Sequence, residues 1–157
     1  EAKFLGFNTL ILSSSIVGEI REAALFHSAI VKEVISSGNP IPRPACILSG
    51  GETTVTIKGT GLGGRNQEFA LAGAIEISGI EKVVLLSGGT DGTDGPTDAT
   101  GAVADHTTVD RANSMGMDPK AYLKDNNAYP FFKKLGDLLI TGPTHTNVMD
   151  VRILLVD

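Results

Sequence analysis

Three stretches rich in glycine and hydroxyl groups hold the residues whose types and spacing could do chemistry. In the first, the glycine cluster at residues 59–64 is followed directly by Arg65. Glycines let a backbone approach a ligand closely, and the planar guanidinium of arginine suits a carboxylate or a phosphate. A polar helix start follows, Arg-Asn-Gln-Glu, so this stretch indicates an anion held at a helix N-terminus.

Residues 59–64 read Gly-Thr-Gly-Leu-Gly-Gly, which fits the G-x-G-x-x-G pattern of dinucleotide sites. The pattern alone is a weak signal. Residues 53–58 alternate like a half-exposed hairpin strand, and residues 82–87 lead into Ser-Gly-Gly at 87–89 without the acidic residue that would bind a ribose. A nicotinamide site and a plain turn, with Arg65 paired to Glu68 or another acid, both stay open.

The second stretch, residues 88–105, is dominated by glycine, aspartate and threonine. It contains four carboxylates of the kind Mg²⁺ accepts: Asp91, Asp94, Asp98 and Asp105. It also contains three hydroxyls that could bind a phosphate or a hydroxy acid: Thr90, Thr93 and Thr97. Aspartate and glycine are equally the commonest turn residues, and the spacing is not that of an EF-hand. Its place after a predicted buried strand favours a ligand site, because α/β sheets bind ligands at the carboxyl ends of their strands.

The third stretch, residues 142–150, offers neutral hydrogen-bonding groups on Thr144, Thr146 and Asn147. His145 could act as a general base, although a lone loop histidine is more often simply exposed. The chain contains no nucleophile elbow, Walker lysine motif, H-E-x-x-H motif or Cys/His cluster. The three stretches therefore favour anion binding but do not supply a complete catalytic set.

Composition limits the class of protein. A chain of 157 residues that is 41% apolar can bury one core, so we expect a single domain over residues 1–157. The net charge of −5, with scattered lysines and arginines, argues against nucleic-acid or membrane-surface binding. The single Cys46, read as a core residue, favours a reducing compartment, and no apolar run is long enough to span a bilayer. We therefore expect a cytoplasmic protein.

Hydrophobic periodicity predicts the elements that must position these stretches. Strands are expected at residues 7–13, 45–49, 53–58, 82–87, 137–140 and 148–156. Helices are expected at residues 19–37, 65–78, 107–115, 119–125 and 129–135, with Asp118 capping the fourth. The pattern predicts a layered α/β fold: a mixed, mostly parallel sheet flanked by helices, with a β-hairpin joining residues 45–49 to 53–58. The apolar run at 82–87 predicts a strand covered on both faces.

Taken together, the motifs "SGGETTVTIKGTGLGGRNQEF", "LLSGGTDGTDGPTDATGAVAD" and "GPTHTNVMD", with "SSSIVGEIREAA" upstream, resemble one family. The chain resembles the carboxy-terminal MOFRL domain of class II glycerate kinases over nearly its whole length. The resemblance implies phosphorylation of D-glycerate by ATP and Mg²⁺, typically at the 2-hydroxyl. Some members carry the name hydroxypyruvate reductase, so an NAD(P)-dependent reductase stays an alternative, as does a non-catalytic ligand-binding module.

The resemblance also implies where the site lies. Family members place it in a cleft between this domain and a Rossmann-like amino-terminal domain, which would be absent here. The chain is then expected to be a C-terminal fragment, whether truncated, proteolysed or from a split gene, and inactive alone. Arg65 is the expected catalytic residue, and Asp91 and Asp94 are the expected metal ligands. The expected substrate- or phosphate-binding residues are Gly63, Gly64, Asn66, Thr90, Asp91, Thr144 and Asn147. Partners would be D-glycerate, ATP and the missing domain, and a homo-oligomer is left open.

Overall fold

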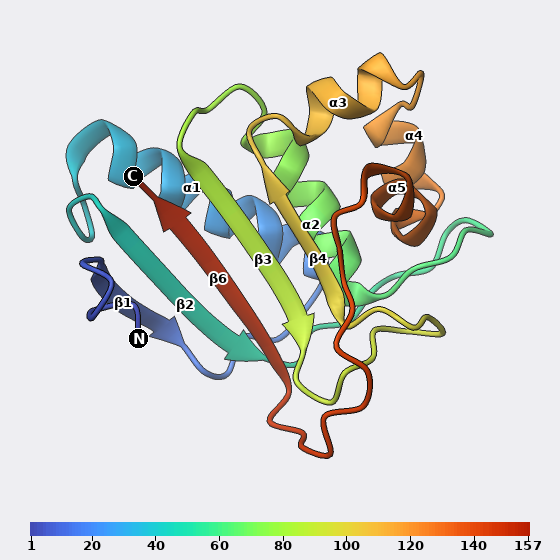
Figure 1. Cartoon of the computed structure of the whole chain (residues 1–157), viewed down its shortest axis with the longest axis horizontal. Coiled ribbons are helices and arrows are strands. Elements are labelled where there is room, and N and C mark those ends of the chain that lie inside the picture. The colour runs from blue at the N-terminus through green and yellow to red at the C-terminus, as the bar shows by residue number, and fades with distance from the viewer.

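A computed structural model describes residues 1–157 as one six-stranded sheet with helices packed on it (Figure 1). The strands are β1 (Asn8–Ser13), β2 (Ala45–Gly51), β3 (Val83–Gly89), β4 (Gly101–Asp105), β5 (Leu138–Leu139) and β6 (Asp150–Val156). The helices are α1 (Ile20–Ser37), α2 (Arg65–Glu76), α3 (Thr108–Ser114), α4 (Pro119–Lys124) and α5 (Ala128–Leu135). All five predicted helices are confirmed, each within a few residues of its expected ends.

The strand order is β1-β2-β6-β3-β4-β5, so the expected mixed α/β sheet is confirmed. The expectation of mostly parallel pairing is wrong, because only β1 and β2 pair in parallel. β2 and β3 point the same way, but the carboxy-terminal strand β6 inserts between them and runs antiparallel to both. Strand order depends on contacts distant in sequence, which local periodicity does not contain.

The predicted hairpin between residues 45–49 and 53–58 is also wrong. Residues 53–58 form no strand and make only an isolated bridge between Thr54 and Glu19. The chain leaves the sheet at Gly51, whose φ of +130° an L residue rarely adopts. A strand that was not predicted, β4, pairs antiparallel with β3; it lies inside residues 88–105 and is built largely from glycine and alanine.

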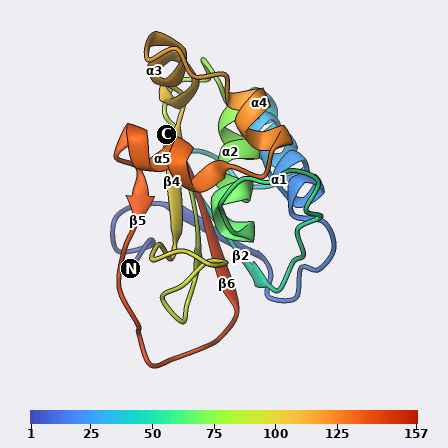
Figure 2. The same cartoon turned by 90° about the vertical axis from the view of Figure 1, so that its right-hand side faces the viewer.

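The helices α1, α2 and α4 lie on one side of the sheet (Figure 2). As its almost entirely apolar circumference predicts, α2 packs on several sides, touching α1, β3, β4, α4 and α5. The opposite face of the sheet is only partly covered within this chain: Val84 and Ile11 are exposed. The prediction that β3 is covered on both faces is therefore wrong at Val84.

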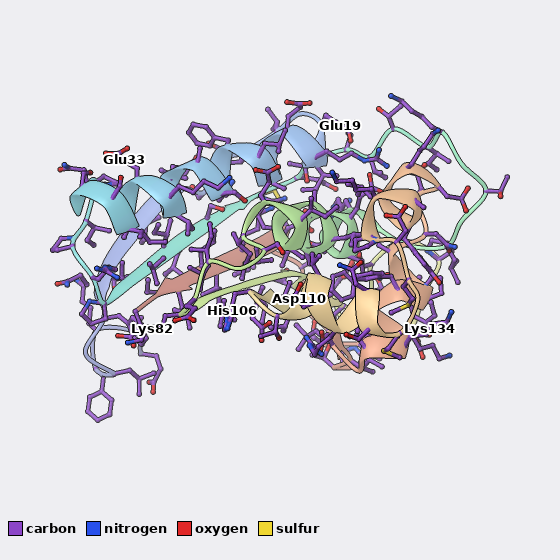
Figure 3. The ribbon with its side chains drawn as sticks, turned by 90° about the horizontal axis from the view of Figure 1, so that it is seen from above. Glu19, Glu33, Lys82, His106, Asp110 and Lys134 are labelled. Atoms are coloured by element: carbon purple, nitrogen blue, oxygen red, sulfur yellow. The ribbon has the colours of Figure 1, made fainter.

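The charged side chains of the helices are exposed or half-buried, apart from Glu68 of α2, which is buried. Seen from above, Glu33 of α1 and Lys134 of α5 lie far apart at the periphery (Figure 3). The predicted cap of α4 is confirmed: the Asp118 carboxylate accepts a hydrogen bond of 2.9 Å from the Lys120 N–H, and Pro119 is the first helical residue. None of the helices is both long and apolar enough to cross a bilayer.

Candidate functional site

β2 and β3 end, and β6 begins, at the same edge of the sheet (Figure 1). A cleft lies beside this edge. Asp150, the first residue of β6, sits opposite Gly51 of β2 and Gly89 of β3. The cleft has a volume of about 430 Å³ and is lined mainly by polar residues and glycines. Its lining residues are Thr53, Thr54, Val55, Ile57, Gly63, Gly64, Arg65, Asp91, Thr93, Asp94, Gly95 and Pro96. The β2–α2 and β3–β4 connections therefore supply its walls.

The N-terminus of α2 opens at this cleft and is capped by a carboxylate from elsewhere in the chain. The N-cap residue Gly64 has no side chain, and Asp94 from the β3–β4 connection takes its place. The Asp94 carboxylate accepts hydrogen bonds from the backbone N–H groups of Asn66, at 3.0 Å, and Gln67, at 2.8 Å. A Cβ on Gly64 would lie 2.3 Å from Asp94 Cγ, so only glycine lets these two segments meet.

Burial raises the pKa of Asp94 to about 6, and the hydrogen bonds from Asn66 and Gln67 oppose that rise. The neighbouring Asp150 carboxylate adds to the rise by like-charge repulsion. Asp94 therefore titrates much closer to neutral pH than an ordinary aspartate does. A carboxylate of this kind responds strongly to any charge brought into the cleft.

Arg65 is held rigidly at the first position of α2. Its Nε donates to Asp150 Oδ2 at 2.8 Å and its Nη2 donates to Asp150 Oδ1 at 3.1 Å, which is a two-point contact along one side of the guanidinium. This hydrogen bonding raises the pKa of Arg65 further. The remaining Nη1 lies 3.6 Å from the exposed Glu52. The guanidinium therefore keeps N–H groups that Asp150 does not use, on the side away from that carboxylate.

A buried polar cluster lies behind this contact. Asp150, which is fully buried, also accepts hydrogen bonds from Asn66 Nδ2 at 2.9 Å and from Arg152 Nη2 at 3.2 Å. Asn66 is fixed in turn by Ser87, whose hydroxyl donates to Asn66 Oδ1 at 2.6 Å. The cluster therefore joins α2, β3 and β6 beneath the floor of the cleft.

The G-x-G-x-x-G loop is bound by the chain itself. The N–H groups of Gly59 and Thr60 donate to the side-chain oxygens of Asn126 and Asp125, and those of Gly61 and Leu62 donate to Asp125 and Asn127. A Cβ on Gly61 would lie 2.4 Å from the Asn127 Cβ. These glycines permit close packing on the α4–α5 connection, and the amides that a pyrophosphate would need are already used. Only the N–H groups of Gly63, Gly64 and Arg65 make no hydrogen bond in this stretch.

The predicted site residues fall into two groups. Gly63, Gly64, Arg65, Asp91 and Asp94 come together as lining of the cleft. The other four predicted residues, Asn66, Thr90, Thr144 and Asn147, do not line it.

Those four residues instead hold the fold together. Asn66 is buried in the polar cluster. Thr90 donates to the Met149 carbonyl at 2.7 Å, Thr144 donates to the Thr90 carbonyl, and Asn147 accepts from the Met149 N–H at 3.0 Å. These contacts tie the β3–β4 connection to the one before β6. Ligand contacts by these residues stay predictions.

Sequence reasoning missed Asp150 and Arg152 as parts of the site. Both are fully buried, on the same face of β6. A usable signal was present, because charged residues two positions apart in an otherwise apolar strand must share one face. Two buried charges on one face must be paired to be tolerated.

The aspartates do not form a metal site by themselves. No group of three or more His, Cys, Asp or Glu side chains is arranged to hold a metal ion. Both oxygens of Asp94 accept hydrogen bonds from α2, and Asp91 Oδ1 accepts from the Thr93 N–H at 3.1 Å. The donor set of this chain therefore does not fit a complete Mg²⁺ site, and ligation by Asp91 and Asp94 stays a prediction.

Comparison with known proteins identifies the family. A model of the MOFRL family matches residues 45–150, which span the cleft from β2 to Asp150. The chain belongs to the MOFRL family. Its resemblance to that family, drawn from the three motifs, is thereby confirmed.

Named relatives of this MOFRL chain include kinases. A D-glycerate 2-kinase from Thermotoga maritima is 53% identical over 155 residues, which is 99% of this chain and 37% of the relative. A glycerate 2-kinase from Pyrococcus horikoshii is 45% identical, over 99% of this chain and 36% of the relative. A relative from Agrobacterium vitis, 41% identical over 96% of this chain and 35% of its own length, is named provisionally as a hydroxypyruvate reductase.

A solved structure shares the fold. The crystal structure of a glycerate kinase from Thermotoga maritima superposes with a TM-score of 0.97 at 52% identity, over 99% of this chain and 38% of that chain. The MOFRL chain thus spans little more than a third of the length of the relatives it matches.

Proposed function

We propose that this chain forms one wall of the active site of a glycerate 2-kinase, which transfers a phosphoryl group from ATP to D-glycerate. The observation that carries the proposal is the guanidinium of Arg65, fixed at the edge of the cleft in a chain of the MOFRL family. During transfer, the glycerate hydroxyl oxygen bonds to the γ-phosphorus as the bond to ADP breaks, and charge spreads over the transferred oxygens. N–H donors that are already in position stabilise that charge.

The charges in the cleft support one wall and not a whole site. Arg65 is the only cation among the lining residues, which also include the carboxylates of Asp91 and Asp94. ATP carries several negative charges, and Arg65 is the single cation in the cleft. Most of the positive charge that balances ATP must therefore come from outside this chain. ATP as the donor, Mg²⁺, a Rossmann-like partner domain and a cytoplasmic location are parts of the proposal. We assign no step to a metal ion. If a metal ion binds in the cleft, Asp91 is the carboxylate with more free oxygen, because only Thr93 donates hydrogen bonds to it.

The test compares two arginines with the same local chemistry in the full-length protein that carries this sequence. Arg65 and Arg111 are each paired through two nitrogens to one aspartate, and both are about one-third exposed: 34% and 38% of their side chains. Only Arg65 lines the cleft. We expect Arg65→Met to lower kcat/KM for glycerate phosphorylation by about a hundredfold or more, and Arg111→Met to change it less than about threefold. Equal effects of the two substitutions on ADP release would refute the assignment.

The 157-residue chain alone should show no turnover. ADP release that depends on both ATP and glycerate, measured with the purified chain, would show that the site is complete without a second wall. For the reductase alternative, the occupied amides of residues 59–62 argue against a pyrophosphate there. NADH titration should therefore give no fluorescence enhancement with the full-length protein.

A further inference from the structure

The side chain of Asp150 is placed where it can decide the orientation of Arg65. It lies at the first position of β6, between the ends of β2 and β3, and is fully buried. Both of its oxygens face Arg65, with donor–acceptor distances of 2.8 and 3.1 Å to Nε and Nη2. A carboxylate that meets one side of a guanidinium at two points fixes the plane of the guanidinium as well as its position.

A carboxylate that holds a catalytic cation would ordinarily cancel its charge. Here a second cation lies behind the carboxylate: Arg152 Nη2 donates to the same Asp150 Oδ2 at 3.2 Å. Two arginines therefore share one aspartate, which leaves this group of three with a net charge of +1. Because Arg152 is fully buried, the uncancelled charge is accessible only through Arg65 at the cleft, although the exposed Glu52 screens part of it.

Arg152 is an unusual residue to bury for structural reasons alone. Its Nε and Nη1 have no hydrogen-bond partner, and burial lowers its pKa. Its remaining contacts are Thr53 Oγ1 at 2.8 Å and the ring of Phe69, whose centroid is 5.5 Å from Cζ. Buried, incompletely paired charges destabilise a fold, so they occur where a site needs them more often than where packing alone is at stake.

We propose that Asp150 is a positioning residue for the reaction of the proposed glycerate kinase. Its carboxylate, balanced by Arg152, holds Arg65 so that Nη1 and the outer edge of Nη2 face an anionic oxygen in the cleft. Asp150 itself touches no substrate. The inference rests on the proposed function, in which Arg65 contacts glycerate or the transferred phosphoryl group.

If Asp150 positions the guanidinium group, free guanidinium ion should bind in the space that is left when the Arg65 side chain is removed. In Arg65→Gly, the side chain is gone but the carboxylate that received it remains. Guanidinium ion at millimolar concentration should enter that space, form the same paired contact with Asp150 and restore activity by about tenfold or more. Methylammonium has the same charge but lacks the planar pair of N–H groups, so it should restore little. A purely structural role for Asp150 predicts no such difference.

The experiment measures glycerate-dependent ADP release by the full-length enzyme carrying Arg65→Gly, Asp150→Asn or both. We expect Asp150→Asn alone to lower kcat by about ten- to a hundredfold, and guanidinium to rescue Arg65→Gly but not the double variant. Asp137→Asn is the matched control, because Asp137 also holds an arginine through two nitrogens, Nη1 and Nη2 of Arg111, away from the cleft. Its kcat should not change.

The outcomes separate the two proposals. Full activity in Arg65→Gly overturns the proposed function and this inference with it. Lost activity that guanidinium restores equally with and without the Asp150 carboxylate overturns this inference alone. If Asp150→Asn does not fold, as judged by its circular dichroism spectrum, the single variant still decides: folded Arg65→Gly that guanidinium does not rescue, or that methylammonium rescues as well, contradicts the proposal.

Discussion

Two glycine-rich segments, residues 59–64 and residues 88–101, lie at the same edge of the sheet but relate to the cleft in opposite ways. In the first, the backbone amides up to Leu62 donate hydrogen bonds to oxygens of residues 125–127, so these amides are not available to a ligand. In the second, the contact is made by a side chain: the Asp94 carboxylate caps the N-terminus of α2. Glycine lets both segments come close to other parts of the chain. Residues 59–62 pack on residues 125–127, whereas residues 88–101 place the Asp94 carboxylate at the cleft.

Alanine at Gly64 should have the largest effect, because it breaks the point where the two segments meet. Its Cβ would lie 2.3 Å from Asp94 Cγ, so the cap must move off α2. We expect Gly64→Ala to lower the free energy of unfolding by about 3 kcal/mol and, in the full-length protein of the proposed function, to weaken glycerate phosphorylation as well. Gly61→Ala should destabilise similarly through its clash with Asn127, yet leave kcat largely intact in the folded fraction.

Gly63→Ala is the matched control, because its Cβ would meet nothing closer than 3.3 Å. Urea denaturation should place its loss below about 1 kcal/mol. If Gly61→Ala reduced kcat as strongly as Gly64→Ala does, the distinction between residues 59–62, which pack on residues 125–127, and Gly64, which meets Asp94 at the cleft, would be wrong.

The two segments should also differ in how they make stability depend on pH, because residues 88–101 contain the buried Asp94 carboxylate and residues 59–64 contain no titratable side chain. The pKa of Asp94 is about 6 in the folded protein against an ordinary value of 3.8. Between these pH values the folded state binds a proton that the unfolded state has released, so the free energy of unfolding falls as pH rises from about 4 to 6. The contribution amounts to at most about 3 kcal/mol and is absent above pH 7.

Denaturation curves of Asp94→Asn and the parent between pH 4 and 7 test this sign. The variant should lack that fall, so the stability difference between the two proteins should change across this range. Asp91→Asn, in the same segment but exposed, should track the parent. A difference of the opposite sign would mean that the hydrogen bonds from Asn66 and Gln67 outweigh burial.

The helices of this fold could be predicted from sequence because the signal that specifies them is local. The apolar residues of α1 recur at helical spacing, and Asp118 with Pro119 marks the start of α4. Strand pairing is different, since β6 is the last strand in the chain yet lies between β2 and β3. β4 was missed because glycine and alanine carry little strand preference, and it is a strand because it pairs with β3 and β5.

The same division explains the site. Arg65 and Asp94 were recognised as candidates because residue type and neighbouring glycines suffice to suggest an anion-binding arginine and a metal-binding carboxylate. Asp150 was not, because its importance depends on register: β6 must lie between β2 and β3 before a carboxylate at its first position can reach α2. The alternation of β6 indicates that Asp150 and Arg152 share a buried face, but the contact of Asp150 with Arg65 depends on three strands meeting and cannot be found by examining β6 alone.

The third prediction tests the residues that hold residues 59–64. Asn126 accepts from the N–H groups of Lys58 and Gly59 and donates to Glu68 Oε2 at 2.9 Å. It also has a φ of +54°, which asparagine tolerates better than most residues. We expect Asn126→Ala to lower the free energy of unfolding by about 2 kcal/mol, because buried groups lose their partners. Asn126→Gly tolerates the positive φ but still leaves the partners of the Asn126 side chain without hydrogen bonds. It should therefore be more stable than Asn126→Ala but less stable than the parent.

The smallest effect separates two buried serines by their partners. Ser87 donates to Asn66 Oδ1 at 2.6 Å and so holds the carboxamide that links Asp94 to Asp150, whereas the hydroxyl of buried Ser28 has no hydrogen-bond partner. Ser87→Ala should lower the free energy of unfolding by about 1 kcal/mol, since it leaves a buried carbonyl oxygen unpaired. Ser28→Ala removes an unpaired hydroxyl and should be neutral or stabilising. Both differences can be measured as shifts of the urea midpoint. Equal effects would mean that the network around Asn66 is dispensable, and that Asp94 and Asp150 hold their places through their direct contacts with α2 alone.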